Sequence, residues 1–268
     1  MNILKPTSVL TCIDPKMSRL AGWITLSFFC LAPAFAGPGE LTVLSLTPLK
    51  EAVTDALARF EKDTGQLVTV HFVNRAQLKS VLHGSEHPDV VMASEELITE
   101  LEKAGQTQKN ARSALGRTGL GVATPQAAPA TDVSSPEAFK QAILQSKSLI
   151  YADPSENLGG QQVKALLDRL ELSAAVKAKT QFGTGNNPVA PIGFGDVAMG
   201  VYSINEILMA KGARLAGPLP VSLQVWIRYD VAMVAEAPNQ SEAKRLMSYL
   251  VGAQAKQSFV SKGFEAIP

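Results

Sequence analysis

The chain has 268 residues, 25 Lys and Arg against 24 Asp and Glu, and a formal net charge of +1. This balance lacks the basic excess of nucleic-acid-binding domains, so we expect no nucleic-acid partner. Hydrophobic residues make up 46% of the sequence, which is enough for a substantial core in one large or two medium domains. The only cysteines, Cys12 and Cys30, lie close to the N-terminus.

Residues 1–36 have the pattern of a secretory signal peptide. Lys16 and Arg19 precede an apolar run at 20–31, and the segment 34–36 (Ala-Phe-Ala) places small residues at the two positions that signal peptidase reads. We therefore expect residues 1–36 to be cleaved and the remaining chain to reach the periplasm.

A membrane anchor is the alternative for this segment. The apolar run is shorter than the roughly 20 residues that span a bilayer, and Pro33 interrupts its end, which favours cleavage near Gly37. Translation from Met17 would still give a signal peptide of ordinary length. Cleavage would remove three basic residues, one acidic residue and both cysteines, which leaves a net charge of −1 and excludes disulfides and thiolate metal sites.

Short apolar runs then alternate with amphipathic segments, as in βα units. Gly65 is a natural end for the first amphipathic segment. The expected elements are strands at 41–44, 67–73 and 89–93 and helices at 49–62 and 76–82. Three such units in succession predict a parallel sheet that is covered by helices on both faces.

The pattern restarts in the middle of the chain, after a surface connection at 123–135 that is rich in Pro, Thr and Ser. The expected elements are strands at 149–152, 179–182, 198–202 and 223–234, and helices at 160–170, 189–194, 241–249 and one ending at Gly263. The last two helices have only the first unit left to pack on.

This order predicts two lobes. Residues 37–118 and 224–268 would form lobe one, residues 119–223 would form lobe two, and two crossings near 115–123 and 221–228 would act as a hinge. The fold class is α/β, with mixed sheets flanked by helices. Ligands in open α/β sheets bind beyond the carboxyl ends of the strands, so facing lobes would close over a small solute.

Several short segments, in order and spacing, resemble periplasmic solute-binding proteins similar to the molybdate-binding component of ABC importers. These segments are Leu41 to Thr47, Pro88 to Val91, Tyr151 to Pro154 followed by Gly159-Gly160, Gly217 to Pro220, and Phe259 to Phe264. The resemblance implies the two-lobed type II periplasmic-binding-protein fold. It also implies delivery of the ligand to an ABC permease in the inner membrane. We expect the protein to be a monomer.

The resemblance further implies that serine hydroxyls and backbone N–H groups after strands one and two hold a tetrahedral oxyanion, together with a lobe-two tyrosine. This chain departs from that pattern. Pro48 stands in the first loop, Asn74-Arg75 replaces the expected serines, and Ser203 lies near the tyrosine position. The ligand is therefore expected to be a small anion, either a molybdate-like oxyanion or an organic acid.

In lobe one, Ser45 and Thr47 precede a helix, so their hydroxyls and the helix amides could receive an anion; the alternative is that either residue only caps the helix. Asn74 and Arg75 follow the second strand. If the Arg75 guanidinium lies in the cleft, it can bind a carboxylate through two hydrogen bonds, which favours an organic acid as the ligand. The alternative is that Arg75 is a solvated surface side chain.

In lobe two, Gly/Asn loops follow the strands and leave backbone N–H groups free to donate. Asn187 is expected to cap a helix that begins at Pro188. The candidate ligand-binding residues of this lobe are Asn157, Gly159, Gly160, Gly185, Asn186, Asn187 and Ser203.

We expect a binding protein with no cofactor, no metal and no catalytic residue. His83 and His87 have the spacing of a helical metal site, but Pro88 and Gly84 disfavour a helix there. The alternative is a periplasmic enzyme on the same fold, such as an isomerase of a small polycarboxylate. Glu156, Tyr202 or another ionisable group would then move the proton.

Overall fold

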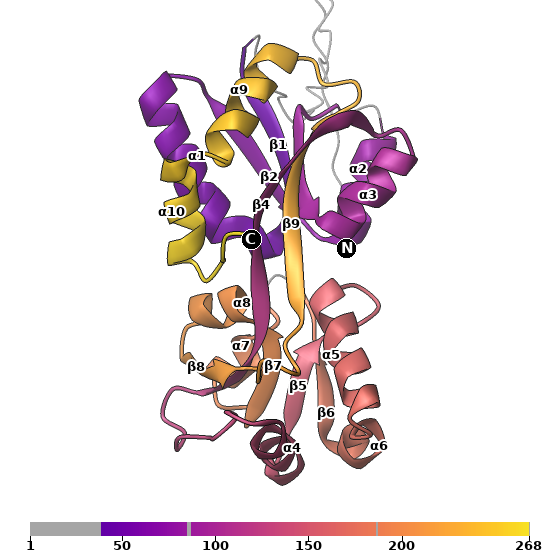
Figure 1. Ribbon diagram of the computed structural model, residues 1–268, viewed down its shortest axis with the longest axis vertical. Helices are drawn as coiled ribbons and strands as arrows, with labels where there is room; N and C mark the ends of the chain where they lie inside the picture. Colours follow the sequence, from indigo (N-terminus) through magenta and orange to yellow (C-terminus); the bar gives the residue numbers. More distant parts are fainter. Residues whose placement is uncertain (1–38, 85–86, 186, 268) are drawn as a thin grey trace, which may run out of the picture. The chain divides into compact units, whose positions relative to one another are not determined.

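The computed structural model describes residues 39–84, 87–185 and 187–267 (Figure 1). The expected signal peptide and Asn186 lie outside these ranges. Among the helices in them, none is long and apolar enough to cross a membrane.

The strands and helices follow in order along the described chain. The strands are β1 (Leu41–Leu46), β2 (Val68–Val73), β3 (Val90–Ser94), β4 (Thr107–Pro125), β5 (Leu149–Ala152), β6 (Thr180–Gly183), β7 (Met199–Ser203), β8 (Ala213–Pro218) and β9 (Trp226–Val234). The helices are η1 (Thr47–Leu49), α1 (Lys50–Thr64), α2 (Arg75–His83), α3 (Glu95–Lys103), α4 (Pro136–Gln145), α5 (Leu158–Arg169), α6 (Ser173–Val176), η2 (Lys177–Lys179), α7 (Ala190–Gly193), α8 (Ile204–Met209), α9 (Gln240–Leu250) and α10 (Ala253–Ser261).

The strands form a mixed sheet in the order β2-β1-β3-β9-β4-β7-β5-β6, with β8 paired to β4 outside this path. In lobe one, β1 is parallel to β2 and β3, and β9 is antiparallel to β3. In lobe two, β5 is parallel to β6 and β7, while β7 and β8 are antiparallel to β4. The parallel strands of each lobe therefore end at one common edge.

The strands β4 and β9 run side by side from one lobe to the other (Figure 1). The first part of β4 pairs with β9 from Thr107, opposite Val234, to Gly119, opposite Trp226. Its last residues pair instead with β7 and β8. The expected crossing at 115–123 lies within β4, and the one at 221–228 covers the residues before β9 and its start. The lobe boundaries remain a prediction.

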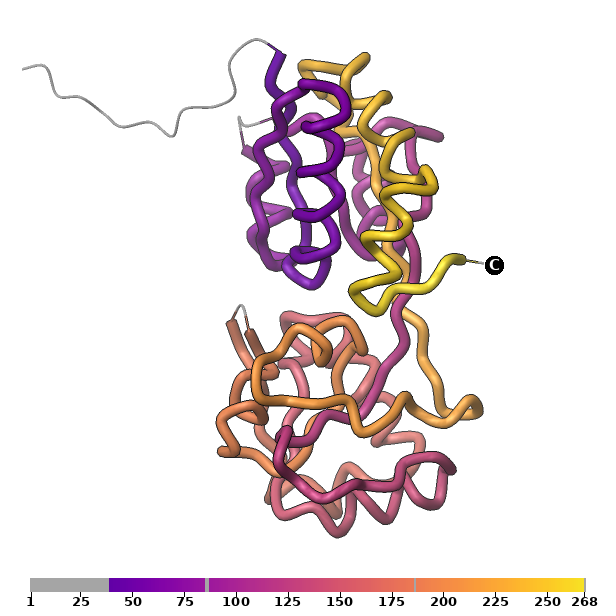
Figure 2. Tube along the Cα trace, turned by 90° about the vertical axis from the view of Figure 1, so that its left-hand side faces the viewer, coloured from indigo at the N-terminus to yellow at the C-terminus, as the bar shows by residue number. Residues whose placement is uncertain are grey.

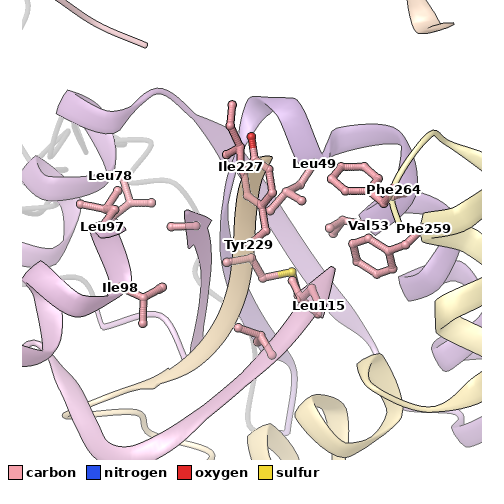
Figure 3. Close-up of a cluster of buried hydrophobic side chains, with 14 of the residues drawn as sticks. Leu49, Val53, Leu78, Leu97, Ile98, Leu115, Ile227, Tyr229, Phe259 and Phe264 are labelled. Atoms are coloured by element: carbon pink, nitrogen blue, oxygen red, sulfur yellow. The ribbon is translucent and has the colours of Figure 1, made fainter. Parts of the chain in front are cut away.

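The core of lobe one lies on both faces of its sheet. Figure 3 shows Leu78, Leu97 and Ile98 of α2 and α3 on one side of β9, with Val53 of α1 and Phe259 of α10 on the other. These side chains are at most 2% exposed. The C-terminal helices α9 and α10 pack on α1, as the sequence predicts, and Figure 2 shows this return of the chain end to the first unit.

Lobe two adds a second group of buried side chains. Ile150, Ile192, Tyr202 and Ile207 bring together β5, β7, α7 and α8. On the other side of the strands, α5 packs on β5 and β7, and α6 packs on α4 and α5. Each lobe is thus a sheet between two helical layers, which confirms the predicted two-lobed α/β fold.

Among the elements that were not predicted from the sequence are α3, α4, α6, α8 and β8; of β4, only residues 115–123 were expected, as a crossing between the lobes. Residues 107–114 are polar and do not alternate, so their strand conformation comes from pairing with β9 and not from local pattern. The expected cap at Asn187 was wrong, because Val189 is the N-cap of α7 and the helix begins at Ala190.

A buried carboxylate, Asp89, joins three segments of lobe one. It is 1% exposed, its Oδ2 accepts from the Thr42 N–H at 2.9 Å, and its Oδ1 accepts from the Asn239 N–H at 2.7 Å. The Asn239 side-chain Nδ2 also donates to Oδ2 at 3.3 Å. Asp89 thereby holds the starts of β1 and β3 against the residue that precedes α9.

We predict that Asp89→Ala lowers the free energy of unfolding by about 2–4 kcal/mol, because it leaves buried donors without an acceptor. Urea unfolding measures the change. The control is Asp63→Ala, which removes an exposed carboxylate bonded to the Tyr249 hydroxyl at 3.0 Å and should cost below about 1 kcal/mol. Equal losses in the two variants would contradict the role of Asp89.

Candidate functional site

A cavity of about 440 Å³ lies where the strands of both lobes end. Seven chain segments contribute to its wall: six lie at the carboxyl ends of β1, β2, β3, β5, β6 and β7, and the seventh is Tyr229, within β9. Residues on this wall include Thr47, Lys50, Glu51, Asn74, Arg75, Ser94, Asp153, Glu156, Asn157, Gly159, Thr184, Gly185, Asn187, Ser203, Glu206 and Tyr229. This is the position at which open α/β sheets bind ligands.

Helices begin at this wall because β2 and β3 lead into α2 and α3 with at most one residue between, and a short loop leads from β5 into α5. The side chains of Asn74, Ser94 and Asn157 cap α2, α3 and α5 by accepting from the backbone N–H of the third helical residue, at 2.8, 3.4 and 3.1 Å. All three also line the cavity. The positive ends of these helix dipoles therefore converge on one space, which favours negative charge there.

The cap side chains use their acceptor oxygens on the helices. Each consequently keeps a donor for the cavity: the Ser94 hydroxyl hydrogen and the Nδ2 groups of Asn74 and Asn157. No hydrogen bond among the described residues engages these donors. The wall thus offers neutral donors to an anion.

The predicted residues of lobe one divide into two groups. Thr47, Asn74 and Arg75 lie on the cavity wall, whereas Ser45 is fully buried and donates to the Leu46 carbonyl at 3.3 Å. Neither hydroxyl caps the first helix, because Leu46 is the N-cap of η1 and has no side-chain hydrogen bond. The Thr47 hydroxyl donates to the Val73 carbonyl at 3.2 Å instead.

In lobe two, Asn157, Gly159, Gly185, Asn187 and Ser203 lie on the wall. Gly160 does not, and its role is packing. A Cβ on this residue would lie 2.1 Å from the carbonyl oxygen of Ala152, so only glycine lets α5 begin this close to β5.

Arg75 is on the wall, but its guanidinium is held by two carboxylates of α3. Its Nη2 lies 2.7 Å from Glu100 Oε2, and its Nη1 lies 3.4 Å from Glu96 Oε1. Lys79 also pairs with Glu100, and these cations, Lys79 first, lower the pKa of the Glu100 carboxyl. Neutral donors at the helix starts are therefore the more available anion contacts.

Sequence reasoning missed several polar residues on the wall, among them Ser94 and Glu206. Ser94 ends the buried strand β3 and is followed by two glutamates, which is the pattern of a helix start. Glu206 stands three residues after Ser203, in the spacing of a capping box. Both signals were present in the sequence, but they required the strand ends to be assigned first.

One hydrogen bond joins the two lobes beside the cavity. The Asn205 Nδ2 donates to the carbonyl of Pro48 in η1 at 2.7 Å, and the Asn205 side chain is fully buried. Gly263, which follows α10, also lies against Asn205 and Leu208 of α8. The start of α8 is thus held from lobe one on two sides.

Comparison with known proteins agrees with this geometry. The model of a family described as bacterial extracellular solute-binding protein matches residues 41–265. The chain belongs to this family. It is 25% identical over 233 residues to an aconitate isomerase from a Pseudomonas species, covering 85% of this chain and 88% of the relative.

This solute-binding protein is also 26% identical over 257 residues to the molybdate-binding protein ModA of Azotobacter vinelandii, covering 93% of this chain and 98% of that protein. The solved periplasmic molybdate-binding protein of Azotobacter vinelandii superposes with a TM-score of 0.71 at 15% identity, over 85% of this chain and 100% of that one. The predicted resemblance to molybdate-binding proteins and the type II fold are confirmed.

The carboxyl group of Glu206 has an unusual electrostatic environment. Burial raises the pKa of Glu206 to about 7, although hydrogen bonds from the hydroxyl and the backbone N–H of Ser203 oppose the rise. Glu206 meets solvent only in part, through the cavity. Burial and the nearby Glu206 also raise the pKa of Tyr229.

We predict that Glu206→Gln stabilises the solute-binding protein at high pH. The folded-state pKa of Glu206 is raised from 4.5 to about 7, so the folded protein holds this proton more tightly than the unfolded chain. The resulting contribution to the free energy of unfolding is fully present below pH 4.5 and is lost as the pH rises through 7. The variant should gain about 2 kcal/mol over wild type at about pH 8, with a smaller gain near pH 5.

Urea unfolding at the two pH values measures this difference. Glu137→Gln is the control, because Glu137 is an exposed first-turn glutamate of α4 outside the cavity wall. A gain for Glu206→Gln that is the same at both pH values would contradict the assigned pKa shift.

Proposed function

We propose that this protein captures a small anion in the periplasm and delivers it to an ABC permease of the inner membrane. The observation that carries the proposal is the convergence of capped helix N-termini from both lobes on one cavity. Helix dipoles and neutral donors stabilise an anion without requiring an unpaired cation.

An organic acid fits the cavity better than a molybdate-like oxyanion. A volume of about 440 Å³ lies in the range of roughly 300–1,000 Å³ that holds small organic ligands. Donors on helix starts of both lobes, such as Ser94 and Asn157, would contact carboxylates at separate points of one ligand. A di- or tricarboxylate is therefore the preferred ligand class.

Capture would proceed by movement of the lobes. Residues 37–118 and 224–268 form lobe one in this proposal, and residues 119–223 form lobe two. An anion would bind the donors of lobe one first, and rotation about β4 and β9 would bring the α5 and α8 starts onto it. The permease would recognise the closed monomer.

We predict that Ser94→Ala weakens binding of the preferred anion by about 10-fold or more, because it removes a hydrogen-bond donor to a charged ligand. A thermal-shift panel of trans-aconitate, tricarballylate, molybdate and sulfate selects the ligand, and calorimetry measures its affinity.

The matched control is Ser135→Ala. Ser135 caps α4 in the same way, accepting from the Ala138 N–H at 3.1 Å, but it is not on the cavity wall. This variant should lose a similar amount of stability and keep its affinity. Equal affinity losses in both variants, or no stabilisation by any anion of the panel, would contradict the proposed site.

A second candidate function is isomerisation of a small unsaturated polycarboxylate. The observation that favours it is Glu206, a carboxyl on the cavity wall whose pKa of about 7 suits both removal and return of a proton. Similarity to an aconitate isomerase supports this reading. Glu156 also lies on the wall, whereas the Tyr202 hydroxyl donates to the Pro188 carbonyl at 2.7 Å.

The reaction would be a proton shift without net oxidation. Ionised Glu206 would take a proton from the methylene carbon, and the electron pair would delocalise into the adjacent double bond and its carboxylate. Return of the proton to the far carbon would leave the double bond moved by one position. Helix N-termini would stabilise the charge that develops on the carboxylate.

For this second function we predict that the protein incorporates deuterium into trans-aconitate in D₂O and forms the cis isomer, both followed by proton NMR. Glu206→Gln should lose the exchange, because its side chain cannot accept a proton, while Glu137→Gln should keep it. Binding of trans-aconitate without any exchange would exclude the isomerase and leave the binding function intact.

A further inference from the structure

Glu206 places an acidic side chain in a cavity whose other features attract anions. It is the third residue of α8 and stands three positions after Ser203, whose hydroxyl and backbone N–H act to lower the pKa of its carboxyl. The cavity wall also includes Tyr229 of β9 and Thr47 of η1. A bound anion and an ionised Glu206 would therefore repel each other within this cavity.

No cation offsets the charge of Glu206 within the described chain. The cationic side chains of the wall are Lys50 and Arg75; Arg75 is bound by two carboxylates of α3, and Lys50 is exposed. Neither lowers the pKa of Glu206, which depends on burial and on Ser203.

The other ionisable groups around the cavity are acidic or neutral. Glu51 of α1 and Asp153 and Glu156 of the segment between β5 and α5 add negative charge to the wall. Burial first, and then the nearby Glu206, raise the pKa of Tyr229 on β9 and of Tyr202 on β7, so both phenols are neutral. None of these groups can neutralise an ionised Glu206.

We propose that Glu206 takes up a proton when the cavity binds an anion, and donates that proton in a hydrogen bond to the ligand. The site then binds one anion and one proton together. This inference rests on the proposed anion-binding function and specifies the residue that makes it depend on pH.

The carboxyl group of Glu206 can serve both the free protein and the anion complex. A neutral Glu206 still accepts from Ser203 through one oxygen and presents an O–H donor to the cavity through the other. The free group titrates near neutrality, at a pKa of about 7, so uptake of the proton costs little free energy at physiological pH. Anion binding and protonation are reciprocally coupled.

The coupling has a defined sign. The complex holds a proton that free Glu206 loses above about pH 7, so the affinity for the anion falls as the pH rises. From about pH 6 to about pH 8, we expect a loss of about tenfold in wild type. Glu206→Gln removes this group and should show a flat profile over the same range, apart from any titration of the ligand.

Calorimetry in two buffers of different ionisation enthalpy measures the proton uptake directly. We would titrate molybdate and trans-aconitate into wild type, Glu206→Gln and the control Glu137→Gln at about pH 7.5. Wild type and the control should take up about 0.8 proton more than Glu206→Gln per anion bound, because about that fraction of free Glu206 is ionised at this pH. The difference between variants cancels any ionisation of the ligand itself.

A second measurement needs no variant. The titration of the Glu206 carboxyl, followed by carbon NMR, should shift to higher pH when a saturating anion is present. Anion binding with equal proton uptake in wild type and Glu206→Gln, or an unshifted titration, would overturn the inference and leave the binding function standing. Failure of wild type to bind either anion at any pH would overturn both.

Discussion

The antiparallel pairing of β4 with β9 is the constraint on which the rest of the molecule depends. These two strands belong to the sheet of lobe one over most of their length, and β4 continues into the sheet of lobe two. Because they run continuously between the lobes, the parallel strands on each side end toward the same space. The cavity is a consequence of this shared pair of strands.

The cavity wall is built by residues that serve two purposes. Asn74, Ser94 and Asn157 each satisfy a backbone N–H at the start of a helix, and each then directs its remaining donor outward. Folding and the proposed anion binding therefore use different polar atoms of the same side chains. The free donors of these caps explain how the wall can favour negative charge although Arg75 is paired with Glu96 and Glu100.

The sequence allowed the apolar framework to be predicted but only part of the site. Strands such as β1 and β3 are apolar runs with clear boundaries, so local pattern sufficed. The first half of β4 is polar and takes its conformation from β9. Ser45 and Gly160 were reasonable candidates by their position, yet one points into the core and the other is needed for helix packing. The elevated pKa of Glu206 arises from burial between distant segments, which no local pattern encodes.

The bond from Asn205 to the Pro48 carbonyl links residues 157 positions apart in the chain, and it joins the lobes directly next to Glu206. A rotation that separates α8 from η1 would break this bond. The Asn205 amide hydrogens are shielded from water while the bond persists, so their exchange with solvent records how often the lobes separate. Hydrogen exchange at the Asn205 side-chain amide would thus report on opening of the cavity.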